Sequence, residues 1–199
     1  MIHSITNCIP TTKVTSAGES EAIFIKCNDG GVNAEAFIPV RDGVRDKLNF
    51  WKETPEDERP YSVFMFGFDS ASRSHTYRSI PKSLDVMKKM GFVDLKGYHS
   101  IAPSTLTNMM GFLMGLTRPE VRGNCARDWE TPFDDCPFVW KDFSDMNYVT
   151  LYLEDGNQTF NWGGQSGFME APTDYYLHHM FLALADLRQE QVKVQSPNL

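Results

Sequence analysis

The sequence predicts an α/β domain with a mostly parallel sheet, preceded by a small β-rich lead-in. Two observations support this. Apolar, strand-like runs alternate with segments of helical spacing from Tyr61 onward. The first of these runs is apolar throughout, which is typical of a strand buried on both faces. The chain has 199 residues, of which 41% are hydrophobic and 13% aromatic, so it is long enough to form one domain with a substantial core.

Residues 1–60 are predicted to form the lead-in and a charged linker. The runs "EAIFIKC" and "AEAFIPV" resemble two strands, and the sequence Asn-Asp-Gly-Gly at 28–31 between them is a strong hairpin-turn signal. Residues 41–60 follow. Their second half is charged and contains Pro55 and Pro60, which favours a surface linker.

The α/β domain is predicted over residues 61–187, and its first half contains two strands and a helix. The runs 61–68 and 92–102 are predicted to be strands. Between them lies a helix that Ser79 could cap, with Pro81 in its first turn and Gly91 at its end.

The second half of the domain continues the alternation. A helix is predicted over 104–116, with an apolar stripe that includes Leu106 and Met110. A long loop over 117–137, a short helix over 138–146 and a strand over 147–155 follow. Residues 188–199 are predicted to be a polar tail.

Charge and hydropathy exclude several classes of partner. The formal net charge is -7 and no run of Lys and Arg occurs, so binding to nucleic acid or to an anionic membrane through bulk charge is not expected. No apolar stretch is long enough for a transmembrane helix, and the N-terminus lacks the pattern of a signal peptide. A local basic pocket for one anionic group remains compatible with this composition.

The four cysteines allow three disulfide pairings. The simplest joins Cys8 to Cys27 and Cys125 to Cys136, so that each bridge closes a local loop. The alternative is four unrelated buried thiols. No pair has zinc-like Cys-x-x-Cys spacing. Asn157 begins an Asn-x-Thr glycosylation sequon, which is a candidate modification site in an oxidising compartment.

The candidate catalytic residues lie at predicted strand ends and at a helix start. Asp69 follows the first core strand, and Glu154 and Asp155 end a later one. In an open α/β sheet the carboxyl ends of the strands are where ligands bind. Ser104 and Thr105 open a helix, where unsatisfied N–H groups favour an anion. The alternatives are that the hydroxyls only cap the helix and that Asp69 stabilises a turn.

The ordered segments "VFMFGFDSASRSH", "IPKSL", "LKGYHSIAPSTLTNMMGFLMG", "DDCPFVWKDFSDMNYVTLYLED" and "PTDYYL" resemble the animal family called domain of unknown function 229. That family is placed in the alkaline phosphatase/sulfatase-like superfamily. The resemblance runs from about Cys8 to Leu184. It implies an alkaline-phosphatase-like α/β core and a metal-dependent hydrolase of phosphate or related anionic esters. It also implies a secretory or extracellular location.

The same resemblance implies roles for three residues. Asp69 matches a metal ligand, with zinc the expected metal. The segment Thr105-Leu106-Thr107-Asn108 matches the Thr-x-x-Asn pattern of phosphodiesterase members, with Thr105 as nucleophile and Asn108 as oxyanion donor. Because the nucleophile position is not Cys, sulfatase chemistry based on formylglycine is not supported.

The sequence departs from the superfamily pattern because no Asp-His-Gly triplet occurs. One carboxylate and one hydroxyl do not hold a divalent cation tightly. We therefore expect this chain to be the N-terminal portion of such a hydrolase, inactive by itself and without a tightly bound metal. We also expect its sheet to be incomplete, with an open edge that favours self-association. The alternatives are a non-catalytic secreted binding protein and a truncated product that does not fold well alone.

Overall fold

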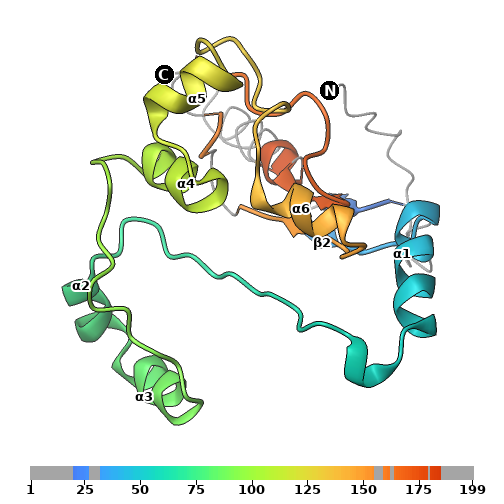
Figure 1. Cartoon of the computed structure of the whole chain (residues 1–199), viewed down its shortest axis with the longest axis horizontal. Coiled ribbons are helices and arrows are strands. Elements are labelled where there is room, and N and C mark those ends of the chain that lie inside the picture. Colours follow the sequence, from blue (N-terminus) through green and yellow to red (C-terminus); the bar gives the residue numbers. More distant parts are fainter. Residues whose placement is uncertain (1–19, 27–31, 155–158, 162–163, 179, 185–199) are drawn as a thin grey trace. The chain divides into compact units, whose positions relative to one another are not determined.

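The computed structural model describes residues 20–26, 32–154, 159–161, 164–178 and 180–184 (Figure 1). These residues form seven helices and two small sheets, a mixed α/β content. The chain divides into two compact units, each described here by itself: unit 1 comprises residues 1–59 and 119–199, and unit 2 comprises residues 60–118.

The N-terminal part of unit 1 is a hairpin followed by a helix. Strands β1 (Ala22–Lys26) and β2 (Val32–Ala36) pair antiparallel, which confirms the β-rich lead-in. The predicted linker is wrong over helix α1 (Asp42–Glu53), because Val44 and other apolar side chains on one face give that segment an amphipathic pattern. The short 3-10 helix η1 (Glu56–Glu58) follows it.

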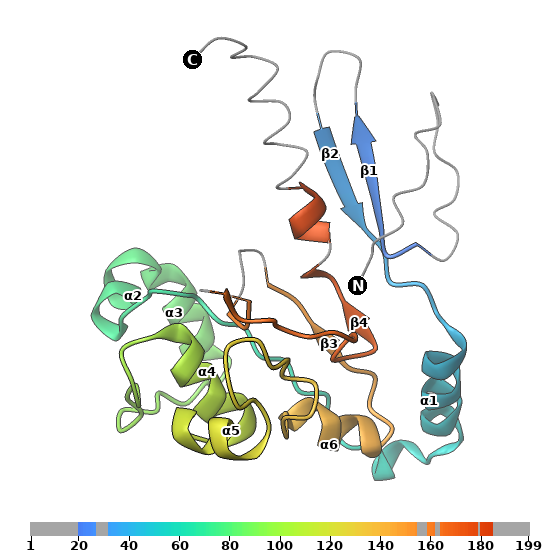
Figure 2. The ribbon, with the colours of Figure 1, turned by 90° about the horizontal axis from the view of Figure 1, so that it is seen from above.

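The C-terminal part of unit 1 contains α5 (Arg118–Asn124), α6 (Val139–Asp145) and a second sheet. Strands β3 (Leu151–Tyr152) and β4 (Tyr175–Tyr176) pair in parallel (Figure 2). The α6 helix and the strand around β3 were predicted, whereas α5 replaces part of the predicted loop.

Aromatic side chains form the core of unit 1. Phe138 and Phe160 are each 1% exposed, and their ring centroids lie 5.2 Å apart. Phe138 stacks on Trp140 at 4.2 Å, and Phe133 contacts Phe160 at 5.3 Å. Contacts of this kind stabilise a core beyond the burial of apolar area.

The disulfide Cys125–Cys136 lies beside this core, with Cα atoms 5.0 Å apart and Cys136 fully buried. It confirms one of the two predicted local bridges. The other, Cys8–Cys27, lies outside the described residues, as do Asn157 and Asp155.

Long-range contacts join the two sequence segments of unit 1. Lys47 on α1 donates to Asp174 Oδ2 at 2.8 Å, and Tyr175 Oη donates to the Pro39 carbonyl at 2.6 Å. Trp51 Nε1 donates to the carbonyl of Asn147 at 2.7 Å. Helix α1 and the segment before it are thus joined to the C-terminal strands, and the hairpin belongs to the same compact unit.

Unit 2 contains α2 (Arg73–Ser79), α3 (Pro81–Lys89) and α4 (Thr105–Met114). Pro81 is in the first turn of α3, as predicted, but Ser79 does not cap it: Ile80 is the N-cap and Ser79 ends α2. Beyond α3, Gly91 adopts a φ of 83°, and the Phe92 N–H donates to the Met87 carbonyl at 3.0 Å. This is a Schellman ending, which requires the left-handed backbone that glycine adopts readily.

The predicted strands over 61–68 and 92–102 are wrong in this structure, because both segments are irregular. The residues between Ser62 and Phe68 make no backbone hydrogen bond within the described residues, although their backbone is extended enough to stack the rings of Phe64 and Phe66 at 6.2 Å. An apolar run becomes a strand only when another strand pairs with its N–H and C=O groups.

The predicted mostly parallel sheet is therefore not formed by the residues that the structure describes, whose two sheets have two strands each. An alkaline-phosphatase-like core is not confirmed. Among the described residues no helix has the length and hydropathy to cross a membrane.

Candidate functional site

Asp69 and Thr105, both in unit 2, lie within hydrogen-bonding distance of each other. Thr105 Oγ1 donates to Asp69 Oδ1 at 3.0 Å, although the two residues are 36 positions apart in sequence. Both side chains are exposed. The structure therefore brings together the predicted metal ligand and the predicted nucleophile.

A sharp turn positions Asp69 at the end of the extended segment. The next residue, Ser70, has a φ of 55°, which turns the chain out of the extended direction. Ser72 then caps α2, its side chain accepting a hydrogen bond from the His75 N–H at 3.1 Å. Ser70 Oγ also donates to the second carboxylate oxygen, Asp69 Oδ2, at a longer 3.5 Å.

Thr105 is the first residue of α4, and the residue before it forms the cap. Ser104 has extended backbone angles, and its side chain accepts from the Thr107 N–H. Ser104 is thus the capping residue, which leaves the Thr105 hydroxyl free for its bond to Asp69. The first-turn N–H groups of a helix have no partner within the helix and favour negative charge beside them.

Asn108 holds the loop that leads into α4. Its Oδ1 accepts from the Ile101 N–H at 2.8 Å, and its Nδ2 donates at 2.7 Å to the carbonyls of both Ala102 and Ser104. Both amide hydrogens are therefore engaged by backbone oxygens. In this conformation Asn108 positions the loop, and it has no free N–H for the predicted oxyanion role.

Glu154 has a local role in unit 1. Its Oε1 accepts the Tyr152 hydroxyl hydrogen bond at 2.6 Å, and its carboxylate also accepts from the Thr159 N–H at 3.2 Å. Burial, followed by the Glu154 charge, raises the pKa of Tyr152 well above its ordinary value. Tyr152 is therefore a neutral donor that orients this carboxylate.

Pattern reasoning missed a second charged cluster in unit 2. Arg73 forms a bidentate ion pair with Asp94: Nη1 lies 2.7 Å from Oδ1, and Nη2 contacts Oδ2. Tyr77 Oη donates a hydrogen bond to the same carboxylate at 3.1 Å. The Arg73 hydrogen bond lowers the pKa of Asp94. Nothing in the spacing of these residues distinguishes them from ordinary surface charges.

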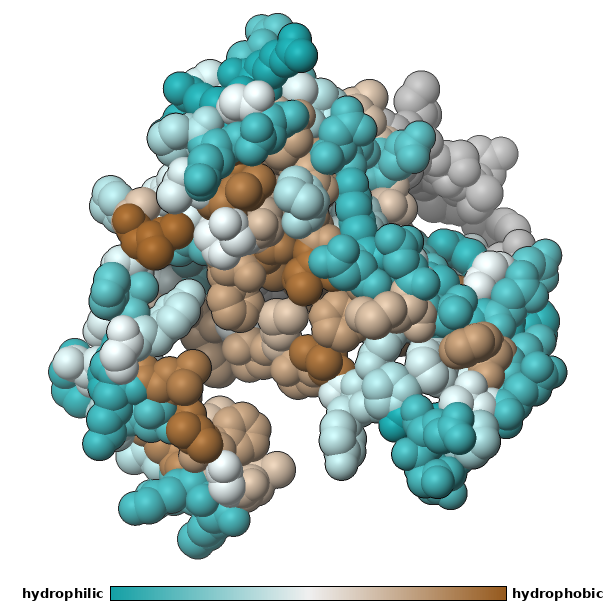
Figure 3. Space-filling model, in the orientation of Figure 1, coloured by the Kyte–Doolittle hydropathy of each residue, from teal (hydrophilic) through white to brown (hydrophobic). Residues whose placement is uncertain are grey.

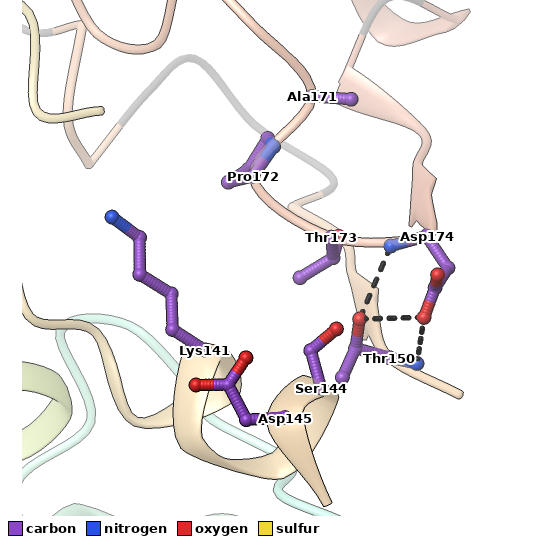
Figure 4. Close-up of a pocket in the computed structure, with 8 residues that line it drawn as sticks. All are labelled: Lys141, Ser144, Asp145, Thr150, Ala171, Pro172, Thr173 and Asp174. Atoms are coloured by element: carbon purple, nitrogen blue, oxygen red, sulfur yellow. Dashed lines mark hydrogen bonds between the residues drawn. The ribbon is translucent and has the colours of Figure 1, made fainter. Parts of the chain in front are cut away.

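A pocket of about 430 Å³ in unit 1 is lined mostly by polar side chains, from α6, from Thr150 before β3 and from the loop before β4 (Figure 4). One of its two acidic residues, Asp174, is engaged within the protein: Oδ2 accepts from the Thr150 N–H at 2.7 Å and from Thr150 Oγ1 at 2.9 Å. Lys141 donates to the Asp134 carbonyl. These bonds stabilise the strand junction and leave the Asp69–Thr105 pair as the better candidate site.

The family model described as "Protein of unknown function (DUF229)" matches residues 6–196, and the chain belongs to this family. No curated protein and no solved structure matches the chain.

Proposed function

We propose that Asp69 and Thr105 form the nucleophile end of a hydrolase site for phosphate or related anionic esters. The observation that carries this proposal is the 3.0 Å hydrogen bond between a helix-start hydroxyl and a carboxylate that is distant in sequence. Exposure of both groups leaves them accessible to a substrate. The resemblance of the sequence to the alkaline phosphatase/sulfatase-like superfamily supports the same assignment.

The pair can supply one balanced step. The Thr105 oxygen attacks the phosphorus atom of the ester, and the bond from phosphorus to the leaving alcohol breaks. The hydroxyl proton moves to Asp69 and then to the departing alkoxide, which leaves as the alcohol. The product is a phosphorylated Thr105, which water would hydrolyse in a second step.

The charge of unit 2 favours an anionic substrate. Unit 2 contains seven Lys and Arg residues and three Asp residues. Its formal net charge is therefore +4, whereas the whole chain has a net charge of -7. A positive unit raises the local concentration of anions. The first-turn N–H groups of α4 add a smaller contribution in the same direction.

The zinc ion implied by the resemblance does not fit the donors that this pair provides. Structural and catalytic zinc sites use at least three protein ligands, and the described residues contain no group of three or more His, Cys, Asp or Glu arranged for a metal. We therefore derive no step through a metal, and we expect this chain alone to turn over ester substrates no faster than the uncatalysed reaction.

Covalent labelling tests the nucleophile directly. Incubation with a p-nitrophenyl alkylphosphonate is expected to add one phosphonyl group at Thr105, located by peptide mass spectrometry. Thr105→Val removes the nucleophile and should abolish the adduct. Asp69→Asn should slow labelling about 100-fold, because loss of a general base has effects of this size.

Ser70→Gly is the matched control, since it removes the other hydroxyl on Asp69 while tolerating the positive φ of 55°. It should label at the wild-type rate. Labelling of Ser79, whose hydroxyl lies 3.0 Å from His75 Nε2, in place of Thr105 would refute the assignment. Turnover of p-nitrophenyl phosphate with added zinc, lost in Thr105→Ala, would contradict the expected inactivity of the chain.

A second candidate function is a non-catalytic interaction through the segment Ser62–Phe68. Phe64 is 87% exposed and Phe66 is 70% exposed. The segment carries no charge, so antiparallel pairing with a second copy would place like rings together without opposing like charges. We propose this self-association as the alternative to catalysis.

Light scattering during gel filtration tests the alternative. A dimer is expected, and Phe66→Lys should convert it to a monomer by placing two like charges at the centre of the pairing. A wild-type protein that is monomeric at every concentration would exclude this function.

We also propose that the protein acts in the secretory pathway or outside the cell. The Cys125–Cys136 bridge supports this location, because structural disulfides persist in oxidising compartments.

A further inference from the structure

The turn that follows α3 carries four exposed apolar side chains, and lysines flank them in the sequence. Met90, Phe92, Val93 and Leu95, here called the apolar tip, are 70%, 64%, 81% and 68% exposed. Figure 3 shows brown apolar surface beside teal hydrophilic surface in the part of the view where α2 and α3 lie in Figure 1.

Lysines lie directly before and after this apolar tip. Lys88 and Lys89 end α3, and Lys96 follows the tip; all three side chains are exposed. The last turn of α3 carries no acidic residue. Cations beside exposed apolar side chains match the two layers of a membrane surface, the anionic headgroups and the acyl boundary below them.

The acidic residue inside the tip is neutralised within unit 2. Asp94 forms its bidentate ion pair with Arg73 and accepts a hydrogen bond from Tyr77. Its negative charge is therefore compensated on the α2 side. Asp85, one turn before the two lysines that end α3, is the other exposed acidic residue nearby, so the three lysines leave the charge around the tip positive. The same pairing fixes the turn against α2, so that the apolar side chains are held outward.

The backbone of the turn is also satisfied in part by internal hydrogen bonds. The N–H groups of Gly91 and Phe92 donate to the Lys88 and Met87 carbonyls, and the Tyr98 N–H donates to the Leu95 carbonyl at 3.0 Å. Unpaired backbone groups are costly in an apolar medium. The extended segment before Asp69 lacks such bonds, so the tip is the better surface for contact with lipid.

We propose that the apolar tip and its three lysines form a peripheral docking site for an anionic phospholipid bilayer. The chain as a whole is acidic, but the charge that faces the bilayer is that of unit 2, whose net charge is +4. Insertion of the apolar side chains into the headgroup region and attraction of the lysines act together, since neither a short apolar turn nor a few charges anchors a protein alone.

Co-sedimentation with vesicles tests the proposal on the full chain. Binding is expected to phosphatidylcholine vesicles that contain phosphatidylserine, and at least tenfold weaker binding to pure phosphatidylcholine. The double variant Lys88→Glu/Lys89→Glu should weaken binding to the anionic vesicles at least tenfold, as should Phe92→Ser/Val93→Ser. Raised salt should weaken binding because it screens the lysines.

Phe112→Ser is the matched control, because it removes an aromatic side chain of the same unit that is 53% exposed and has no flanking lysine. It should bind as the wild type does, and circular dichroism should show that all variants remain folded. No binding to anionic vesicles would overturn the proposal. Equal binding to neutral vesicles, or loss of binding in the control, would also overturn it. A change from dimer to monomer in Phe92→Ser/Val93→Ser without vesicle binding would identify the tip as a protein interface instead.

Discussion

Replacement of Phe138 by Ala is expected to lower the free energy of unfolding by about 4 kcal/mol. Phe138 is 1% exposed, stacks on Trp140 at 4.2 Å and contacts Phe160 at 5.2 Å. Removal of the ring loses its transfer free energy and leaves a cavity among rigid aromatic neighbours that cannot collapse fully. Urea unfolding followed by tryptophan fluorescence would measure the change.

Phe50→Ala is the matched control for this experiment. Phe50 is also in unit 1 but is 46% exposed, so its truncation should cost less than about 1 kcal/mol. Equal losses for the two variants would mean that the aromatic cluster around Phe138 is not the core of the unit. A wild-type protein without a cooperative transition would mean that the chain does not fold stably alone.

Replacement of Asp174 by Asn is expected to destabilise the protein by about 3 kcal/mol at neutral pH. The substitution leaves the Lys47 ammonium, 15% exposed at its side chain, without its carboxylate partner. It also weakens the acceptor that holds the Thr150 N–H and hydroxyl. Urea unfolding at pH 7 would measure this loss.

The same variant should reveal a pH dependence. Burial by itself would raise the pKa of Asp174, but the hydrogen bonds from Lys47 and Thr150 outweigh burial and lower it. A carboxyl whose pKa is lower in the folded state than in the unfolded state stabilises the fold at pH values above its unfolded-state pKa, about 4. This stabilisation is lost as the pH falls through the folded-state pKa. The difference between wild type and Asp174→Asn should therefore shrink below about pH 4.

Asp42→Asn provides the control for charge removal. Asp42 forms an exposed contact with Arg45 at 3.9 Å, and exposed pairs of this kind contribute little. This variant should unfold within about 0.5 kcal/mol of the wild type at every pH. A similar loss in both variants would contradict a specific role for the Lys47–Asp174 pair.

Helices with local end signals could be predicted from the sequence. Ser104 and Gly115 bound α4, and Pro81 and Gly91 bound α3, because caps act within one turn of the helix. Local sequence could not decide whether residues 61–68 form a strand, since a strand depends on pairing partners elsewhere in the chain. Helix α1 was missed because charged residues and nearby prolines obscured its apolar face.

The candidate site was predictable only in part. Residue types and the family pattern indicated Asp69 and Thr105, and the structure places their side chains within 3.0 Å of each other. Their roles as metal ligand and nucleophile stay predictions. The engagement of Asn108 with the backbone of residues 101–104 was not predictable, because the sequence does not show which direction a side chain takes. The Arg73–Asp94 pair likewise depends on how the chain turns after α3.

The discontinuity of unit 1 has a consequence for synthesis of the chain on the ribosome. Lys47 and Asp174 are 127 residues apart, and ribosomes add roughly 5–20 residues per second. Helix α1 therefore emerges on the order of 10 s before its partners exist. During that interval its apolar face is open to chaperones or to premature contacts, so the yield of folded protein should depend on translation speed and temperature as well as on the stability of the finished unit.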